Sequence, residues 1–72
     1  MYRHDKAYFD YKLKISGTTQ EAAAKACGLD RSTLRRRFEK GTITLNDMYA
    51  IIDFLKLSDE DIARIFFARI GA

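Results

Sequence analysis

The 72-residue sequence contains no proline and only four glycines. Proline disrupts a helix interior and glycine weakens one, so a chain with so few of them is expected to be mostly helical. The chain has about half the length of a typical domain, so we expect a single domain over residues 1–72.

The sequence has one cysteine, which excludes a disulfide framework and a zinc site of the CxxC kind. Its apolar runs are short, so we expect neither a membrane-spanning helix nor a secretory signal peptide. Apolar residues make up 47% and charged residues 32% of the chain, which is typical of globular proteins. We therefore expect a small, soluble, cytoplasmic protein with no metal or cofactor.

Residue sets that catalysis requires are also missing. The sequence offers no nucleophile–base pair, no carboxylate pair for a cleft and no glycine-rich loop to cradle a phosphate. So short a chain has little material for a pocket, so no small-molecule ligand is expected. We expect a binding protein and not an enzyme.

Two helix-start signatures mark the second half of the chain. Thr44 and Asp47 fit a capping box, and Ser58 and Asp61 repeat it. Apolar residues with helical spacing follow each signature. After the first they are Met48, Ile51, Ile52 and Leu55; after the second they are Ile62, Ile65, Phe66 and Ile70.

Capping residues and glycines delimit helices in the first half. Thr19 precedes an alanine-rich helix over residues 20–27, and Asp30 precedes a helix over residues 31–40. A glycine follows each of these helices at the position that ends one. With a further helix within the first sixteen residues, the sequence predicts five helices joined by short turns, an all-α fold.

The net charge of +3 is unevenly distributed. Residues 1–16 carry +2, residues 17–41 carry +3 and residues 42–72 carry −2. Positive charge is densest within the helix over residues 31–40, in Arg31, Arg35, Arg36, Arg37 and Lys40. Such a run often forms a solvated surface, but the planar arginine group also suits phosphate and guanine.

The order of these features resembles the helix-turn-helix of phage repressors and Cro, the lambda-repressor-like or XRE family. Residues 17–20 read Gly-Thr-Thr-Gln, where the family has Gly-x-Thr-Gln before its second helix. Ala24 is the small residue within that helix, and Gly28 makes the turn. The resemblance covers about residues 9–67 and implies a compact five-helix domain with its helix-turn-helix at about residues 20–40.

The sequence departs from this family at one position. The family usually has an apolar residue three positions after Leu34, where this chain has Arg37, and the apolar Phe38 follows. This departure leaves undetermined where the helix that begins at residue 31 ends. Residues 32–37, Ser-Thr-Leu-Arg-Arg-Arg, also resemble a Fis-type helix-turn-helix, but that motif normally closes its domain, whereas a long patterned segment follows here.

The resemblance implies roles in double-stranded DNA binding for individual residues. The expected base readers in the major groove are Arg31, Ser32, Arg35 and Arg36. The expected phosphate contacts are Gln20, Arg37, Lys40, Thr42 and Thr44. Alternatives stay open for some: Arg37 can pair with an acidic residue of a neighbouring helix, and the threonines can serve as loop and cap residues. Lys6, Lys12 and Lys14 could add contacts to the DNA backbone.

Two other side chains receive simpler interpretations. Cys27 is expected to be a buried, unreactive thiol. His4 has no partner at metal-ligand spacing, and we assign it no role.

We expect a homodimer formed by the last helix and the tail, with Phe66, Phe67 and Ile70 at the interface. Its two reading helices would enter successive major grooves about 34–36 Å apart. The alternative is a monomer whose tail folds back.

The predicted function is a sequence-specific, double-stranded-DNA-binding transcriptional regulator, repressor/Cro-like and of phage or mobile-element type. The alternative is a protein-interaction adaptor or antirepressor that keeps the scaffold without reading bases. The acidic charge of the C-terminal third keeps this alternative open.

Overall fold

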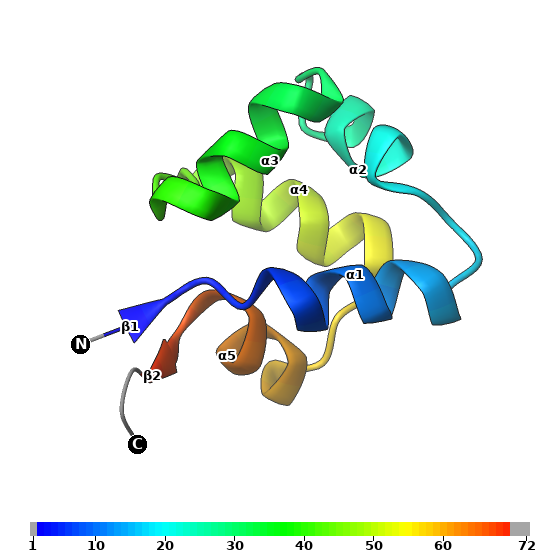
Figure 1. Cartoon of the computed structure of the whole chain (residues 1–72). Helices are drawn as coiled ribbons and strands as arrows, with labels where there is room; N and C mark the ends of the chain where they lie inside the picture. Colours follow the sequence, from blue (N-terminus) through cyan, green and yellow to red (C-terminus); the bar gives the residue numbers. More distant parts are fainter. Residues whose placement is uncertain (1, 70–72) are drawn as a thin grey trace.

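The structure is a computed structural model that describes residues 2–69, and these form five helices and two short strands (Figure 1). The helices are α1 (Lys6–Ile15), α2 (Gln20–Ala26), α3 (Arg31–Lys40), α4 (Leu45–Leu55) and α5 (Asp59–Phe66). In the view of Figure 1, α4 lies between α3 above and α1 below, and α5 lies beneath α1. The expected five-helix architecture is confirmed within the described residues.

Every helix begins at a residue whose side-chain oxygen accepts a hydrogen bond from the backbone N–H three residues on. These caps are Asp5, Thr19, Asp30, Thr44 and Ser58. Both predicted capping boxes are formed in full, at the starts of α4 and α5. Local hydrogen bonding therefore accounts for the agreement between the predicted and observed helix starts.

Two glycines end helices as predicted. Gly41 is the C-cap of α3 with a φ of 70°, and Gly28 follows the C-cap of α2 with a φ of 73°. Other L-residues rarely adopt this left-handed conformation, so glycine suits both turns. The second helix ends at Ala26, one residue earlier than predicted.

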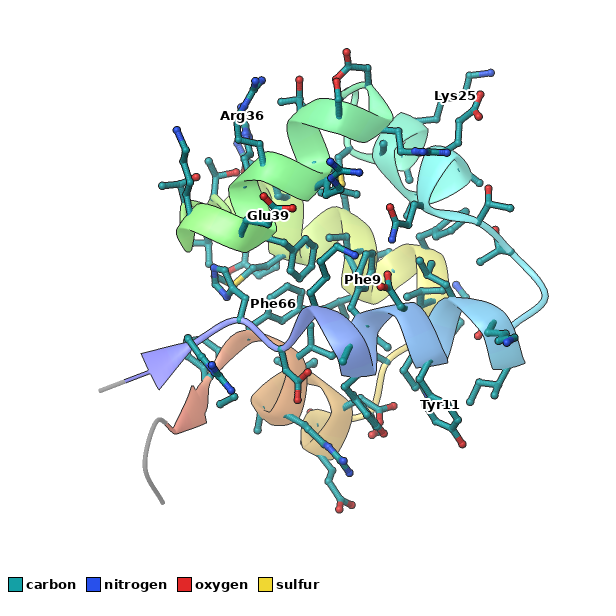
Figure 2. The ribbon with its side chains drawn as sticks, viewed as in Figure 1. Phe9, Tyr11, Lys25, Arg36, Glu39 and Phe66 are labelled. Carbon is teal, nitrogen blue, oxygen red and sulfur yellow. The ribbon has the colours of Figure 1, made fainter. Side chains whose placement is uncertain are left out.

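The core draws its side chains from every helix. Its largest fully buried residues are Phe9, Leu34, Ile51, Ile65 and Phe66. Figure 2 shows Phe9 and Phe66 in the layer between α1 and α3. Ala23 and Ala24 are fully buried on α2, where their small size allows that helix to pack closely on α3 and α4.

A short antiparallel pairing, which the sequence pattern did not predict, joins the two ends of the described chain. β1 (Tyr2–Arg3) pairs with β2 (Ala68–Arg69). Next to it, the Asp5 N–H donates to the Ile65 carbonyl at 2.7 Å, and His4 Nδ1 lies 3.2 Å from the Phe66 carbonyl oxygen. The start of the chain is therefore fastened across the end of α5.

Within residues 2–69, no helix has the length and apolar character needed to cross a membrane. The same part of the chain contains no group of three or more His, Cys, Asp or Glu residues that could hold a metal ion.

Candidate DNA interface

α3 rests on the core through one narrow side and leaves the rest of its surface in solvent. Its buried residues are Leu34 and Phe38, which are four positions apart and therefore share a face. The predicted base readers Arg31, Ser32, Arg35 and Arg36 are all exposed. Figure 2 shows Arg36 projecting away from the body of the molecule. The result is a helix whose outer side can enter a groove of DNA.

The turn between α2 and α3 holds these two helices in a fixed relation. The Leu29 N–H donates to the Ala24 carbonyl at 2.9 Å, which ties the turn back to α2. At the other side of the turn, Asp30 accepts hydrogen bonds from the Thr33 backbone and side chain, which lower the pKa of its carboxyl group. The negative charge therefore remains at the positive end of α3.

Phe38 shows how the fold accommodates the departure from the family pattern, in which the apolar residue comes four positions after Leu34 and not three. It is 4% exposed, and its ring stacks on Phe9 with centroids 4.4 Å apart. α3 continues without interruption to Lys40. The core therefore accepts an apolar side chain four residues after Leu34, and Arg37 is free to point elsewhere.

Arg37 points toward α4 and pairs with a buried carboxylate. Its Nη1 donates to Asp47 Oδ2 at 2.6 Å. Of the two roles predicted for Arg37, the structure therefore shows the pairing with an acidic residue of a neighbouring helix. Asp47 Oδ2 also accepts from the Thr44 N–H at 3.2 Å. A single carboxylate therefore caps α4 and anchors the C-terminal half of α3.

The start of α2 forms one flank of α3. Gln20 Nε2 donates to Asp10 Oδ1 at 2.6 Å, and Lys6 Nζ donates to Asp10 Oδ2 at 2.9 Å. A hollow of about 460 Å³ opens beside them. It is lined by Lys6, Thr19, Gln20, Glu21, Arg31 and Arg35. This flank combines an amide and three cationic groups, which can contact a DNA phosphate, with the carboxylates of Asp10 and Glu21.

The end of α3 and the segment that follows it form the other flank. Lys40, Thr42 and Thr44 are exposed there. Thr44 Oγ1 accepts from the Asp47 N–H at 3.1 Å, and its hydroxyl proton remains able to donate to a phosphate. The hydroxyl can thus cap α4 and contact DNA at once.

Arg3 is a possible DNA contact that the sequence pattern did not indicate. A hollow of about 410 Å³ lies between the N-terminal segment and the end of α3. It is lined by Arg3, His4, Lys6, Phe38, Glu39, Lys40 and Gly41. The β1–β2 pairing brings Arg3 to this place. The net charge of +2 over residues 1–16 was the available signal, but charge alone could not locate it.

An acidic residue also lies on the outer side of α3. Glu39 Oε1 lies 3.4 Å from Arg35 Nε in an ion pair, and both side chains are 57% exposed. An exposed pair of this kind is weak, so DNA can compete for the arginine.

The side of α1 that faces α5 is occupied by structural contacts. Tyr8 Oη donates to Asp61 Oδ1 at 2.8 Å, and Lys12 Nζ lies 3.1 Å from Asp61 Oδ2. These two hydrogen bonds lower the pKa of Asp61 to about 2. The Arg64 guanidinium lies over the Tyr8 ring at 4.1 Å. Lys12 therefore joins two helices, and this use competes with its suggested contact to DNA.

The residues expected at a dimer interface have different surroundings. Phe66 is 2% exposed and stacks on Phe38, so we correct its assignment: it is a core residue. It is buried because the last turn of α5 faces the other aromatic rings of the core. Phe67 is 49% exposed. Ile70 lies outside the described residues.

Cys27 is half-buried at the C-cap of α2. Burial raises the pKa of its thiol, which favours the unreactive protonated form.

A short helix, a glycine turn and a second helix with an exposed basic side together define a helix-turn-helix protein. The sequence model of a family described as helix-turn-helix matches residues 11–62, and the chain belongs to this family, the Cro/C1-type or XRE proteins. The fold is lambda-repressor-like. The family consists of DNA-binding regulators and is not typically enzymatic. No curated protein and no solved structure matches the chain.

Proposed function

We propose that this protein is a sequence-specific regulator of transcription that reads double-stranded DNA by placing α3 in the major groove. The observation that carries the proposal is the exposure of Arg31, Ser32, Arg35 and Arg36 on a helix whose buried residues are Leu34 and Phe38. Burial of the opposite side fixes the direction in which the arginines project.

Base recognition depends most on Arg35 and Arg36. An arginine can donate two hydrogen bonds to guanine O6 and N7, a contact worth about 1–3 kcal/mol of discrimination. Arg36 projects away from the body of the molecule, and Arg35 forms an exposed ion pair with Glu39. Ser32 can bond either a base edge or a phosphate.

Phosphate contacts on the two flanks of α3 set the register of the protein on the duplex. Gln20 serves one flank, and Lys40, Thr42 and Thr44 serve the other. The exposed part of the Arg37 guanidinium can add a contact beside its pair with Asp47. We add Lys6 and Arg3 to this set because the hollows beside α3 are lined by them.

The biological role that fits this arrangement is that of a small repressor of the Cro type, from a phage or mobile element, which acts as a homodimer on a two-fold DNA site. Control by synthesis and by competition for the site is the simplest form of regulation for such a protein.

Selection of bound sequences from a random DNA pool tests the proposal. The wild-type chain should enrich a consensus with two-fold symmetry. The Arg35→Ala and Arg36→Ala double variant should keep its circular dichroism spectrum and lose the consensus. If the wild-type chain enriches no sequence, or the double variant enriches the same one, the proposed reading by α3 is wrong.

A protein-interaction role without base reading is the second candidate. It is favoured by a hollow of about 540 Å³ on the α1–α5 side, lined by Asp5, Ala7, Tyr8, Tyr11 and Arg64. In Figure 2, Tyr11 projects on the side of the molecule opposite Arg36. Under this role, Phe67→Asp should abolish binding to the protein partner, and the Arg35→Ala and Arg36→Ala double variant should bind that partner like the wild type.

A further inference from the structure

A carboxylate lies at the flank of α3 where the proposed function places a DNA phosphate. Asp10 of α1 accepts two hydrogen bonds there, from Gln20 Nε2 at 2.6 Å and from Lys6 Nζ at 2.9 Å. Its side chain is 39% exposed. A negative charge at this place repels the DNA backbone, so it weakens binding unless it performs a task that outweighs the repulsion.

The pair with Lys6 does not account for Asp10 by itself. The two residues are four positions apart on α1, and both side chains are about one-third exposed. A pair of this kind stabilises a helix little, and least when the cationic residue comes first, as it does here. It also engages a cationic group that would otherwise attract DNA. The contact of Asp10 with α2 therefore carries more of the explanation.

The bond from Gln20 determines which way round its amide group is held. A carboxylate oxygen only accepts hydrogen bonds, so the amide nitrogen, and not the carbonyl oxygen, must face Asp10. The nitrogen carries two N–H groups, of which Asp10 takes one. The second N–H and the carbonyl oxygen of Gln20 therefore have fixed directions, whereas an unbound glutamine side chain samples several rotamers.

We propose that Asp10 is a positioning residue for DNA recognition, which holds the Gln20 amide with its second N–H toward a DNA phosphate and its carbonyl oxygen available to an arginine of α3. This inference rests on the proposed function. Gln20, Arg31 and Arg35 line one hollow of about 460 Å³, so their polar groups can meet the same phosphate. The bond to a charged acceptor also polarises the amide and makes its carbonyl oxygen a better acceptor for an arginine N–H.

The two effects of Asp10 act differently on different DNA. Its charge repels the backbone of every duplex alike, since phosphates carry no sequence information. The orientation of Gln20 matters only in the complex with the selected sequence, in which phosphate contacts hold the protein in one register. Asp10 should therefore lower the affinity for unrelated DNA and raise the ratio of the affinities for the selected and the unrelated sequence.

Binding titrations of a selected and a scrambled duplex at low salt test this opposition of signs. Asp10→Ala should bind the scrambled duplex about threefold more tightly, because a negative charge is removed. The ratio of the two affinities should nevertheless fall by about tenfold, because Gln20 loses its orientation. Added salt should abolish the gain on the scrambled duplex and leave the fall in the ratio. Partial unfolding would lower both affinities alike and cannot produce this result.

Glu21→Ala is the matched control. Glu21 is exposed and lines the same hollow, and the Gln20 nitrogen is bonded to Asp10 and not to Glu21. This variant also removes one negative charge, so it should bind both duplexes more tightly by the same factor and keep the wild-type ratio. A ratio that falls as far in Glu21→Ala as in Asp10→Ala would show that charge alone is responsible, and it would overturn the proposal.

A double-mutant cycle shows whether Asp10 acts through Gln20. In a Gln20→Ala background, Asp10→Ala should keep its gain of about threefold on the scrambled duplex and cause no further fall in the ratio. A full fall in the ratio in that background would mean that Asp10 affects recognition by another route, and it would overturn the positioning role.

Nuclear magnetic resonance of the free protein separates this proposal from the proposed function. In the wild type, the Gln20 amide proton that is bonded to Asp10 should resonate downfield, well apart from the second one. In Asp10→Ala the two should approach the values of an exposed glutamine, and in Glu21→Ala they should not move. Resonances that stay unchanged in Asp10→Ala would overturn the orienting role. A wild type that selects no DNA sequence would contradict the proposed function, and the resonances would then decide the orientation of Gln20 by themselves.

Discussion

Arg37 of α3 and Asp47 of α4 form an ion pair at 2.6 Å in which the carboxylate is buried and also caps the second of the two helices. This contact fixes how the reading helix meets the rest of the domain. It also turns Asp47 inward, so that a carboxylate lies on the buried face of α4 beside Ile51 and Leu55.

Removal of the arginine should destabilise the domain. Arg37→Ala leaves the Asp47 carboxylate buried with its cap contacts alone, and we expect the free energy of unfolding to fall by about 1–3 kcal/mol. Urea denaturation followed by circular dichroism measures it. Arg36→Ala is the matched control and should change stability little, because Arg36 is exposed. Equal stability of the two variants would contradict the anchoring role.

Base and phosphate contacts should respond differently to substitution. Arg36→Ala should weaken binding to the selected sequence by about 1–3 kcal/mol and relax preference at one base pair. Lys40→Ala should weaken binding to all sequences alike and reduce the salt slope by about one unit. Titrations of the selected and a scrambled duplex at several salt concentrations measure both. A Lys40 variant with altered sequence preference would contradict this division.

Asp61 should contribute stability that depends on pH. Hydrogen bonds from Tyr8 and Lys12 lower its pKa from 3.8 to about 2. A lowered pKa in the folded state gives stability that is complete above pH 3.8 and is lost as the pH falls toward 2. The difference in unfolding free energy between the wild type and Asp61→Asn should therefore be constant above this window and shrink within it. A difference that is constant down to the lowest pH would refute the assignment.

Gly41 should resist substitution for a backbone reason. Its φ is 70°, and a Cβ at this position would meet no atom within 4 Å. Gly41→Ala should therefore cost about 1–2 kcal/mol through strain alone. Gly41→Asn should cost less, because asparagine tolerates this conformation better. Thermal unfolding of the two variants makes the comparison, and an alanine variant as stable as the wild type would show that the turn is not strained.

Much of the fold could be predicted from the sequence because its signals are local. Thr44 and Asp47, or Ser58 and Asp61, exchange hydrogen bonds across three residues, so the pattern itself specifies the contact. The exposure of Arg36 likewise follows from its position opposite Leu34 and Phe38 on one helix.

Other features of the site depend on residues that are distant in the sequence. The pairing of β1 with β2 places Arg3 beside α3, and two-residue strands are too short for any periodicity to indicate. Phe66 was assigned to an interface because helical spacing cannot distinguish a core face from an exposed apolar face.

The sequence by itself determined where α2, α3, α4 and α5 begin, where α3 ends, and which side of α3 is basic, because capping, turn formation and helical periodicity act within a few residues. Only the tertiary structure decided which carboxylate Arg37 binds, which face of α4 is buried and where Arg3 lies. These depend on the relative positions of packed helices, which result from the fit of all core side chains at once.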